Sequence, residues 1–259
     1  MDATHAEGAA RYLWESHELR ADYVNLPPDL APDGIDAAYA IQDAFHTLAT
    51  PSLGPIDGWK IATTTKVMQQ LMGIDRPCAG AIFQRTIHKS PARLAAADYV
   101  SLKVECEIAF RLARDLPPEK APFTASDVAG AIAAVMPAFE LVDDRHAVYR
   151  ETSALSLIAD NCWNQGVVLG DPKPPLSAEA LGALQGRLEI GDRPALAGKA
   201  DGPLGALAWV ATLIAARGGG LRSGMIVMTG SLIPTTTVGP GETARFSVEG
   251  LGETRLVVT

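Results

Sequence analysis

The sequence has few cysteines, no excess of positive charge and no apolar run long enough to cross a membrane. Its three cysteines, Cys78, Cys106 and Cys162, form no C-x-x-C or Cys/His spacing, which fits a reduced, cytoplasmic compartment. The 22 basic and 30 acidic residues give a net charge of −8, so binding to nucleic acid or an anionic membrane is not expected. The most apolar run, residues 204–216, is too short to span a bilayer and predicts a buried helix.

Several sequence motifs of enzymes are absent as well. There is no G-x-S-x-G, H-E-x-x-H, P-loop or G-x-G-x-x-G, so serine hydrolases, zinc proteases and nucleotide-binding proteins have no support. His88 and His146 have no partner at the spacing of a metal site or a catalytic triad. Residues 1–23 lack the basic and then apolar pattern of a signal sequence. An acidic protein can still bind a small anion where a metal ion or a lysine supplies positive charge.

Residue patterns divide the chain into a helical start and a β-rich remainder. Apolar residues at helical spacing predict helices within 1–53, around the prolines at 27–32. Residues 54–259 predict mainly strands, including a long one within 99–116 and a hairpin over 186–200, with helices over 124–137, 153–161 and 202–219. Regular strand–helix alternation is missing. We therefore predict an α+β fold with two parts, a helical N-terminal region (1–53) and a β-rich catalytic domain (54–259).

The stretch "SLKVECEIAF" carries two carboxylates in an otherwise apolar strand. Side chains alternate between two faces of a strand, so Glu105 and Glu107 project from the same face, ~7 Å apart at the backbone. Two interpretations remain open from the spacing. Either the face is open to water, or it lines a cleft where a divalent cation compensates the repulsion.

A third glutamate, Glu140, lies between apolar neighbours in "AFELVDDR". A lone carboxylate there is costly unless it pairs with an arginine or binds a cation. Together with Glu105 and Glu107 it would form an oxygen-only site, which suits Mg²⁺ or Mn²⁺ better than Zn²⁺.

Lys60 in "DGWKIATTT" is the candidate catalytic residue. It lies within a predicted strand, where a partly desolvated lysine is either a structural ion pair or a general acid/base and anion anchor. Thr63 and Thr64 follow at the start of a predicted helix, where they either bind a substrate carboxylate or cap the helix. Ser231, in a turn-rich segment, and Asn161, at a helix end, are further candidates for substrate binding, although a sheet corner and a helix cap need the same residues.

Five segments resemble, in order, the 2-keto-4-pentenoate hydratase group of the fumarylacetoacetate hydrolase superfamily. They are "GWKIATTTKVMQQLMGIDRP", "VECEIAFRLARDLP", "AFELVDDR", "ADNCWNQGVVLG" and "GPLGALAWVATLIA…MIVMTGSLI", within residues 35–250. The E-x-E followed by a distant glutamate resembles the metal signature of the superfamily. The resemblance implies a mixed β-roll or sandwich, a homo-oligomer, and Mg²⁺ or Mn²⁺ held by Glu105, Glu107 and Glu140.

The same resemblance implies a 2-oxo acid substrate from the breakdown of aromatic compounds. Water would add across a conjugated double bond, with Lys60 moving a proton or holding the carboxylate. The chain departs from the group at "RPCAG", where Cys78 stands at the position of an aspartate that is thought to be a second acid/base. A decarboxylase of a 2-oxo-3-enedioate, an acylpyruvate hydrolase and a non-catalytic partner subunit therefore remain as alternatives.

Overall fold

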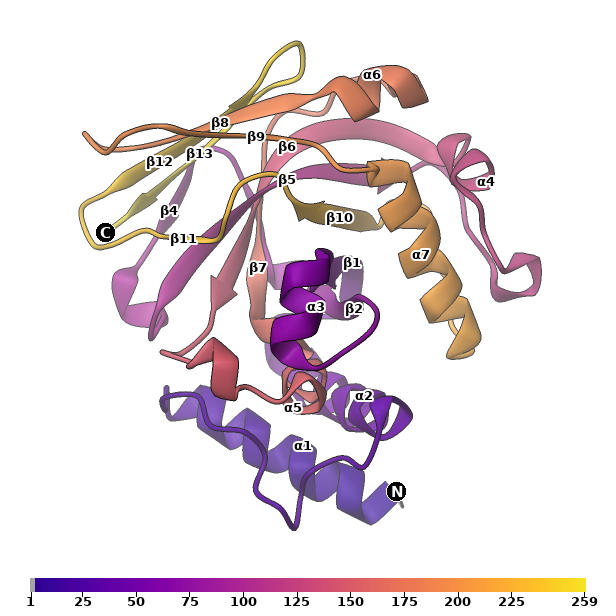
Figure 1. Cartoon of the computed structure of the whole chain (residues 1–259), viewed down its shortest axis with the longest axis vertical. Helices are drawn as coiled ribbons and strands as arrows, with labels where there is room; N and C mark the ends of the chain where they lie inside the picture. Colours follow the sequence, from indigo (N-terminus) through magenta and orange to yellow (C-terminus); the bar gives the residue numbers. More distant parts are fainter. Residues whose placement is uncertain (1–2) are drawn as a thin grey trace.

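The computed structural model describes residues 3–259 and begins with two packed helices, α1 (Ala3–Glu18) and α2 (Ile35–Leu53), low in the view of Figure 1. Small and apolar side chains fill their contact, including Ala10, Leu13 and Phe45. Helix α5 (Ala154–Ala159) packs against α2 from later in the chain. The predicted helices of the N-terminal region are confirmed, whereas its separation from residues 54–259 as a domain stays a prediction.

The larger sheet forms the centre of the molecule and has the strand order β2-β1-β10-β5-β6-β7-β3, with β11 pairing at the end of β5. It is mixed, because β1 runs parallel to β10 and β3 runs parallel to β7, while the other pairs are antiparallel. The strands are β1 (Ile56–Ala62), β2 (Cys78–Phe83), β3 (Ile87–Lys89), β5 (Leu102–Leu112), β6 (Ile132–Asp143), β7 (Asn164–Leu169), β10 (Ile226–Ser231) and β11 (Thr236–Thr237).

A smaller sheet packs on the larger one and completes the sandwich (Figure 1). Its order is β4-β13-β12-β8-β9, from β4 (Ala92–Leu94), β8 (Gln185–Ile190), β9 (Leu196–Lys199), β12 (Thr243–Val248) and β13 (Gly252–Val258). Phe139 of the large sheet meets Phe246 of the small one with ring centroids 6.1 Å apart, within one continuous apolar core. The α+β sandwich class is therefore confirmed.

The longest helix of the β-rich part packs against inner strands of the large sheet. The apolar run predicted as a buried helix is α7 (Pro203–Ala216), which packs along β10 and β1 through Leu207, Val210 and Ile214. The others are α3 (Lys66–Met72), α4 (Ala125–Ala129), α6 (Ala178–Ala183) and the 3₁₀ turns Gln84–Thr86, Ala96–Asp98, Pro118–Lys120, Tyr149–Glu151 and Asn161–Trp163. No helix within residues 3–259 is long and apolar enough to cross a membrane.

Two local predictions were incomplete. The helix expected over 124–137 ends at Ala129, after a capping box between Thr124 and Asp127, and β6 begins already at Ile132. Strand β2 was missed, because all of its residues are buried and its sequence "CAGAIF" therefore shows no alternation of polar and apolar side chains.

Candidate active site

The three glutamates meet where β5 and β6 pair in the large sheet. Glu105 lies directly opposite Glu140 in this antiparallel ladder, and Glu107 follows two residues along β5 on the same face. One carboxylate oxygen from each lies within 4.8 Å of the others. The strand register therefore brings together the set predicted from the sequence.

Burial makes this carboxylate cluster electrostatically costly. Glu107 and Glu140 are both fully buried. Desolvation, reinforced by the neighbouring carboxylates, raises the pKa of Glu107 well above its usual range. Desolvation also raises the pKa of Glu140 to about 7, although the ammonium group of Lys60 acts in the opposite direction. Without a cation, burial therefore favours the protonated forms of Glu107 and Glu140.

Each carboxylate is fixed through one oxygen by a neighbouring donor. The backbone N–H of Gly230 donates to Oε2 of Glu107 over 2.7 Å. The Thr235 hydroxyl donates to Oε1 of Glu105 over 2.6 Å, and Asn164 Nδ2 donates to Oε1 of Glu140 over 3.0 Å. Gly230 has φ +99°, a left-handed conformation that glycine adopts without strain. These contacts orient the cluster.

Two carboxylate oxygens of the cluster remain without any hydrogen-bond partner, Oε1 of Glu107 and Oε2 of Glu140, and both are buried. Buried polar atoms are rarely left unpaired in a folded protein, so these two are the natural ligands of a bound ion. Three oxygen donors with excess negative charge fit a hard divalent cation such as Mg²⁺ or Mn²⁺. The residues present therefore fit the metal.

Lys60, on β1, reaches the cluster from the neighbouring part of the sheet. Its Nζ lies 2.9 Å from Oε1 of Glu140, and the residue is only 2% exposed. Burial is the largest single effect and lowers the pKa of Lys60, but the charges of Glu140 and its neighbours, with the hydrogen bond to Glu140, together leave the pKa raised. The ammonium group therefore stays protonated beside the carboxylates.

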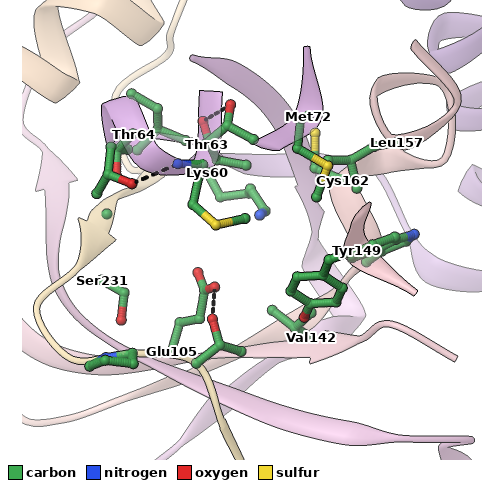
Figure 2. Close-up of a pocket in the computed structure, with 18 of the residues that line it drawn as sticks. Lys60, Thr63, Thr64, Met72, Glu105, Val142, Tyr149, Leu157, Cys162 and Ser231 are labelled. Carbon is green, nitrogen blue, oxygen red and sulfur yellow. Dashed lines mark hydrogen bonds between the residues drawn. The ribbon is translucent and has the colours of Figure 1, made fainter. Parts of the chain in front are cut away.

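A cavity of about 560 Å³ opens over this centre. Figure 2 shows Lys60 and Glu105 pointing into it, with Thr63, Thr64 and Ser231 along its margin. The hydroxyl of Thr63 donates to the carbonyl of Ala62, and Ser231 Oγ accepts from the Cys106 N–H and donates to the Ile233 carbonyl. Three of the four predicted substrate-binding residues thus line the cavity. The hydroxyl groups of Thr63 and Ser231 also form hydrogen bonds with the backbone of the cavity rim.

Asn161 does not line this cavity. Its amide oxygen accepts from the Ala81 N–H over 2.7 Å and from His46 over 2.9 Å, and its Nδ2 donates to the Ala81 carbonyl. The residue is 2% exposed and borders a separate hollow of about 160 Å³. Its side chain anchors β2, so the structure places Asn161 in the scaffold and not beside the cluster.

Two buried thiols, those of Cys78 and Cys162, contact each other next to the cavity. Cys162 lines the cavity, and its Sγ lies 3.6 Å from Sγ of Cys78, which is buried and does not line it. The hydrogen bond from Cys162 lowers the pKa of Cys78, and the same contact raises the pKa of Cys162. Cys78 therefore has the lowered pKa that acid/base chemistry requires, but it lies behind Cys162.

Sequence reasoning missed three residues of the site. Asn164 and Thr235 orient glutamates, and Tyr149 forms part of the cavity wall. Two sequence features could have indicated Thr235 and Asn164. They are the run "PTTT" at 234–237 and the second asparagine in "DNCWN". Tyr149 begins the 3₁₀ turn Tyr149–Glu151, and no local pattern indicates its place in the site.

Comparison with known proteins places this site in context. The family model described as "Fumarylacetoacetate (FAA) hydrolase C-terminal" matches residues 80–259. A protein named 2-keto-4-pentenoate hydratase from Paraburkholderia phymatum is 34% identical over 98% of this chain and 97% of its own. A 2-hydroxyhexa-2,4-dienoate hydratase from Comamonas testosteroni is 28% identical over 82% of this chain and 84% of its own.

Among solved structures, 4-oxalocrotonate decarboxylase from Pseudomonas putida G7, complexed with magnesium and adipate, superposes with a TM-score of 0.90. It is 21% identical, and the match covers 100% of this chain and 99% of that one. The sandwich and its helices are therefore shared over the whole length.

Proposed function

The chain belongs to the fumarylacetoacetate hydrolase family, and we propose that it is a divalent-metal-dependent hydro-lyase of the 2-keto-4-pentenoate hydratase type. Its substrate is a 2-hydroxy-2,4-dienoate, or the tautomeric 2-oxo-alkenoate, from the breakdown of aromatic compounds. The observation that carries the proposal is the cluster of three glutamates, two of them fully buried, joined to Lys60 at a single cavity.

Glu105, Glu107 and Glu140 would hold Mg²⁺ or Mn²⁺. When bound, the cation supplies Lewis-acid polarisation of the oxygens of a 2-oxo acid. The donors on Gly230, Thr235 and Asn164 keep the carboxylates in place for that ion. Such orienting contacts tune metal affinity, because they fix the ligand oxygens before the metal arrives.

Lys60 has the position of an acid/base residue. Its protonated Nζ lies at the edge of the cavity, where it attracts a substrate carboxylate and can deliver a proton to the carbon chain. Thr63, Thr64 and Ser231 line the same margin and supply polar groups for the carboxylate end of the substrate. The buried walls exclude bulk water and strengthen these interactions.

Decarboxylation of a 2-oxo-3-enedioate is the second candidate. The observation that favours it is the position of Cys78, which lies behind Cys162 and does not reach the cavity. Decarboxylation needs no group to activate water. A non-catalytic partner subunit is disfavoured, since an unused cluster of buried carboxylates only destabilises the fold.

We also infer that the protein is a cytoplasmic homo-oligomer. The three cysteines are all free and buried, as a reduced compartment allows. Size-exclusion chromatography with light scattering gives the subunit number directly.

The reaction is tested with purified protein and Mn²⁺, first on 2-hydroxypenta-2,4-dienoate and then on 2-oxo-3-hexenedioate. Loss of the conjugated ultraviolet band without CO₂ supports hydration. Release of CO₂ from the second compound supports decarboxylation instead. Bound metal with neither reaction supports the partner-subunit alternative.

A further inference from the structure

The cavity has two chemically different sides. Glu105 of the glutamate cluster, Lys60 and the threonines occupy one side, whereas a continuous apolar wall forms the other. In Figure 2 the labelled members of this wall, Met72, Val142, Tyr149 and Leu157, stand together on the side away from Ser231 and Thr64. The apolar wall consists of Met68, Met72, Val142, Tyr149, Leu157 and Trp163.

The wall is well packed and contains an aromatic pair. The rings of Tyr149 and Trp163 lie 5.5 Å apart between centroids, which places their surfaces in direct contact. Met72, Val142, Leu157 and Trp163 are all buried and belong to one apolar cluster. Burying an apolar group of a ligand against such a surface contributes about 25 cal/mol for each Å² removed from water.

No cation is available on that side to receive a second carboxylate. Among the described residues that line the cavity, Lys60 is the only basic one, and it is paired with Glu140. Lys103 lies over the ring of Tyr149, 5.1 Å from its centroid, but its ammonium group pairs with buried Asp144. A carboxylate held against the apolar wall would therefore lose its hydration without gaining a cationic partner.

We infer that the substrate carries a bulky uncharged substituent, alkyl or aryl, at the end distant from its carboxylate. This inference rests on the proposed function, which orients the 2-oxo acid end toward Lys60 and the glutamates. The apolar wall then receives the distal end and determines specificity. A cavity of about 560 Å³ falls in the range that holds drug-sized ligands, so the small pentadienoate leaves much of it empty.

Binding of unreactive saturated 2-oxo acids tests this preference without requiring catalysis. Isothermal titration of the Mn²⁺-loaded protein compares 2-oxopentanoate, 4-phenyl-2-oxobutanoate and 2-oxoadipate. The phenyl compound is expected to bind about tenfold or more tightly than 2-oxopentanoate, because its ring reaches the apolar wall. 2-Oxoadipate is expected to bind no more tightly than 2-oxopentanoate. Tightest binding of 2-oxoadipate, or equal binding of the phenyl compound and 2-oxopentanoate, overturns the inference.

A charge placed on the wall should reverse the preference. Met68 is half-buried on α3, so Met68→Arg adds a guanidinium group without filling the core, and Met68→Gln is its uncharged control. Met68→Arg is expected to tighten 2-oxoadipate binding about tenfold, the gain from a charged hydrogen bond, whereas Met68→Gln is not. Equal effects of the two variants would show that the distal end does not meet this wall.

The two proposals fail in different ways. If no dienoate loses its ultraviolet band and no CO₂ appears, the proposed reaction is wrong. The order of affinities for the three saturated 2-oxo acids then still tests whether the cavity prefers an uncharged distal substituent. If dienoates are hydrated but 2-oxoadipate binds best, the reaction stands and the uncharged substituent is wrong. Thermal unfolding followed by circular dichroism confirms that each variant is folded before its binding is compared.

Discussion

The ammonium nitrogen of Lys60 lies 2.9 Å from Oε1 of Glu140, and both side chains are almost completely removed from water. The pair joins the candidate acid/base residue to the candidate metal ligands through one shared carboxylate. It also explains how a sheet interior accommodates three glutamates, since each carboxylate meets an opposite charge, a hydrogen-bond donor or both.

Replacement of Lys60 by methionine should separate turnover from metal binding. Turnover is expected to fall about 100-fold or more, because the proton-transferring group is lost. Metal affinity is not expected to fall, since the variant removes a positive charge that competes with the cation for Glu140. Steady-state kinetics and Mn²⁺ titration measure the two quantities. Lys60→Arg is the control, as it keeps the charge but is a poor proton donor, and full turnover in either variant would contradict the role.

Replacement of Glu107 by glutamine should abolish metal binding while the protein stays folded. Glu107 is fully buried, and its free Oε1 has no other partner. The neutral amide removes repulsion from the cluster, so the metal-free variant is expected to be at least as stable as the metal-free wild type. Mn²⁺ titration and thermal unfolding test this, with exposed Glu249→Gln as the control. Unchanged affinity would exclude Glu107 from the site.

Metal removal should make stability depend on pH in a defined direction. The pKa of Glu140 in the folded protein is about 7, above the ordinary value of 4.5. A carboxyl group whose pKa is higher in the folded protein than in the unfolded chain stabilises the folded state most at a pH below its ordinary pKa. This contribution to the free energy of unfolding is lost as the pH rises through the pKa of the folded protein.

In EDTA, the free energy of unfolding that comes from this cluster should therefore decrease as the pH rises between about 4.5 and 7. Bound Mn²⁺ stabilises the charged carboxylates and should remove that decrease. The gain in Tm on adding saturating Mn²⁺ is thus expected to grow from about pH 5 to about pH 8. A gain in Tm that is constant over this range would contradict metal binding by these buried carboxylates.

His46 should produce the opposite pH dependence. Desolvation lowers its pKa from 6.5 to about 4, and the hydrogen bond with Asn161 only partly offsets this effect. A lowered histidine pKa contributes stability that is complete above 6.5 and is lost as the pH falls toward 4. The loss amounts to about 3 kcal/mol over that interval. Denaturant unfolding of the wild type and of His46→Gln at several pH values gives their difference in the free energy of unfolding. This difference should become smaller as the pH falls.

Replacement of Asn161 by alanine should affect the scaffold and not the chemistry. The variant leaves the N–H and carbonyl of Ala81 and the ring of His46 without partners, at an expected cost of about 3 kcal/mol in the free energy of unfolding. The KM for substrate is expected to stay near that of the wild type below the unfolding transition. A large rise in KM with an unchanged free energy of unfolding would show instead that Asn161 binds the substrate.

The sequence by itself determined the local parts of this site. Alternation along 101–110 placed Glu105 and Glu107 on one face, because side chains of a strand alternate by stereochemistry. Helix α3 begins after its cap residue Thr65 and ends at Met72, before its C-terminal cap Gly73, as the residues at its ends predict. These features depend on neighbours in the chain and need no tertiary contact.

Only the tertiary structure decided how these parts meet. The β5–β6 register put Glu140 opposite Glu105, and the place of β1 in the sheet brought Lys60 to Glu140. From the sequence, Asn161 suited a helix cap or a turn better than ligand binding, and the position of β2 decided its contacts. The apolar wall draws side chains from segments far apart in sequence, and no local pattern encodes such contacts, because they arise from burial and strand pairing over the whole chain.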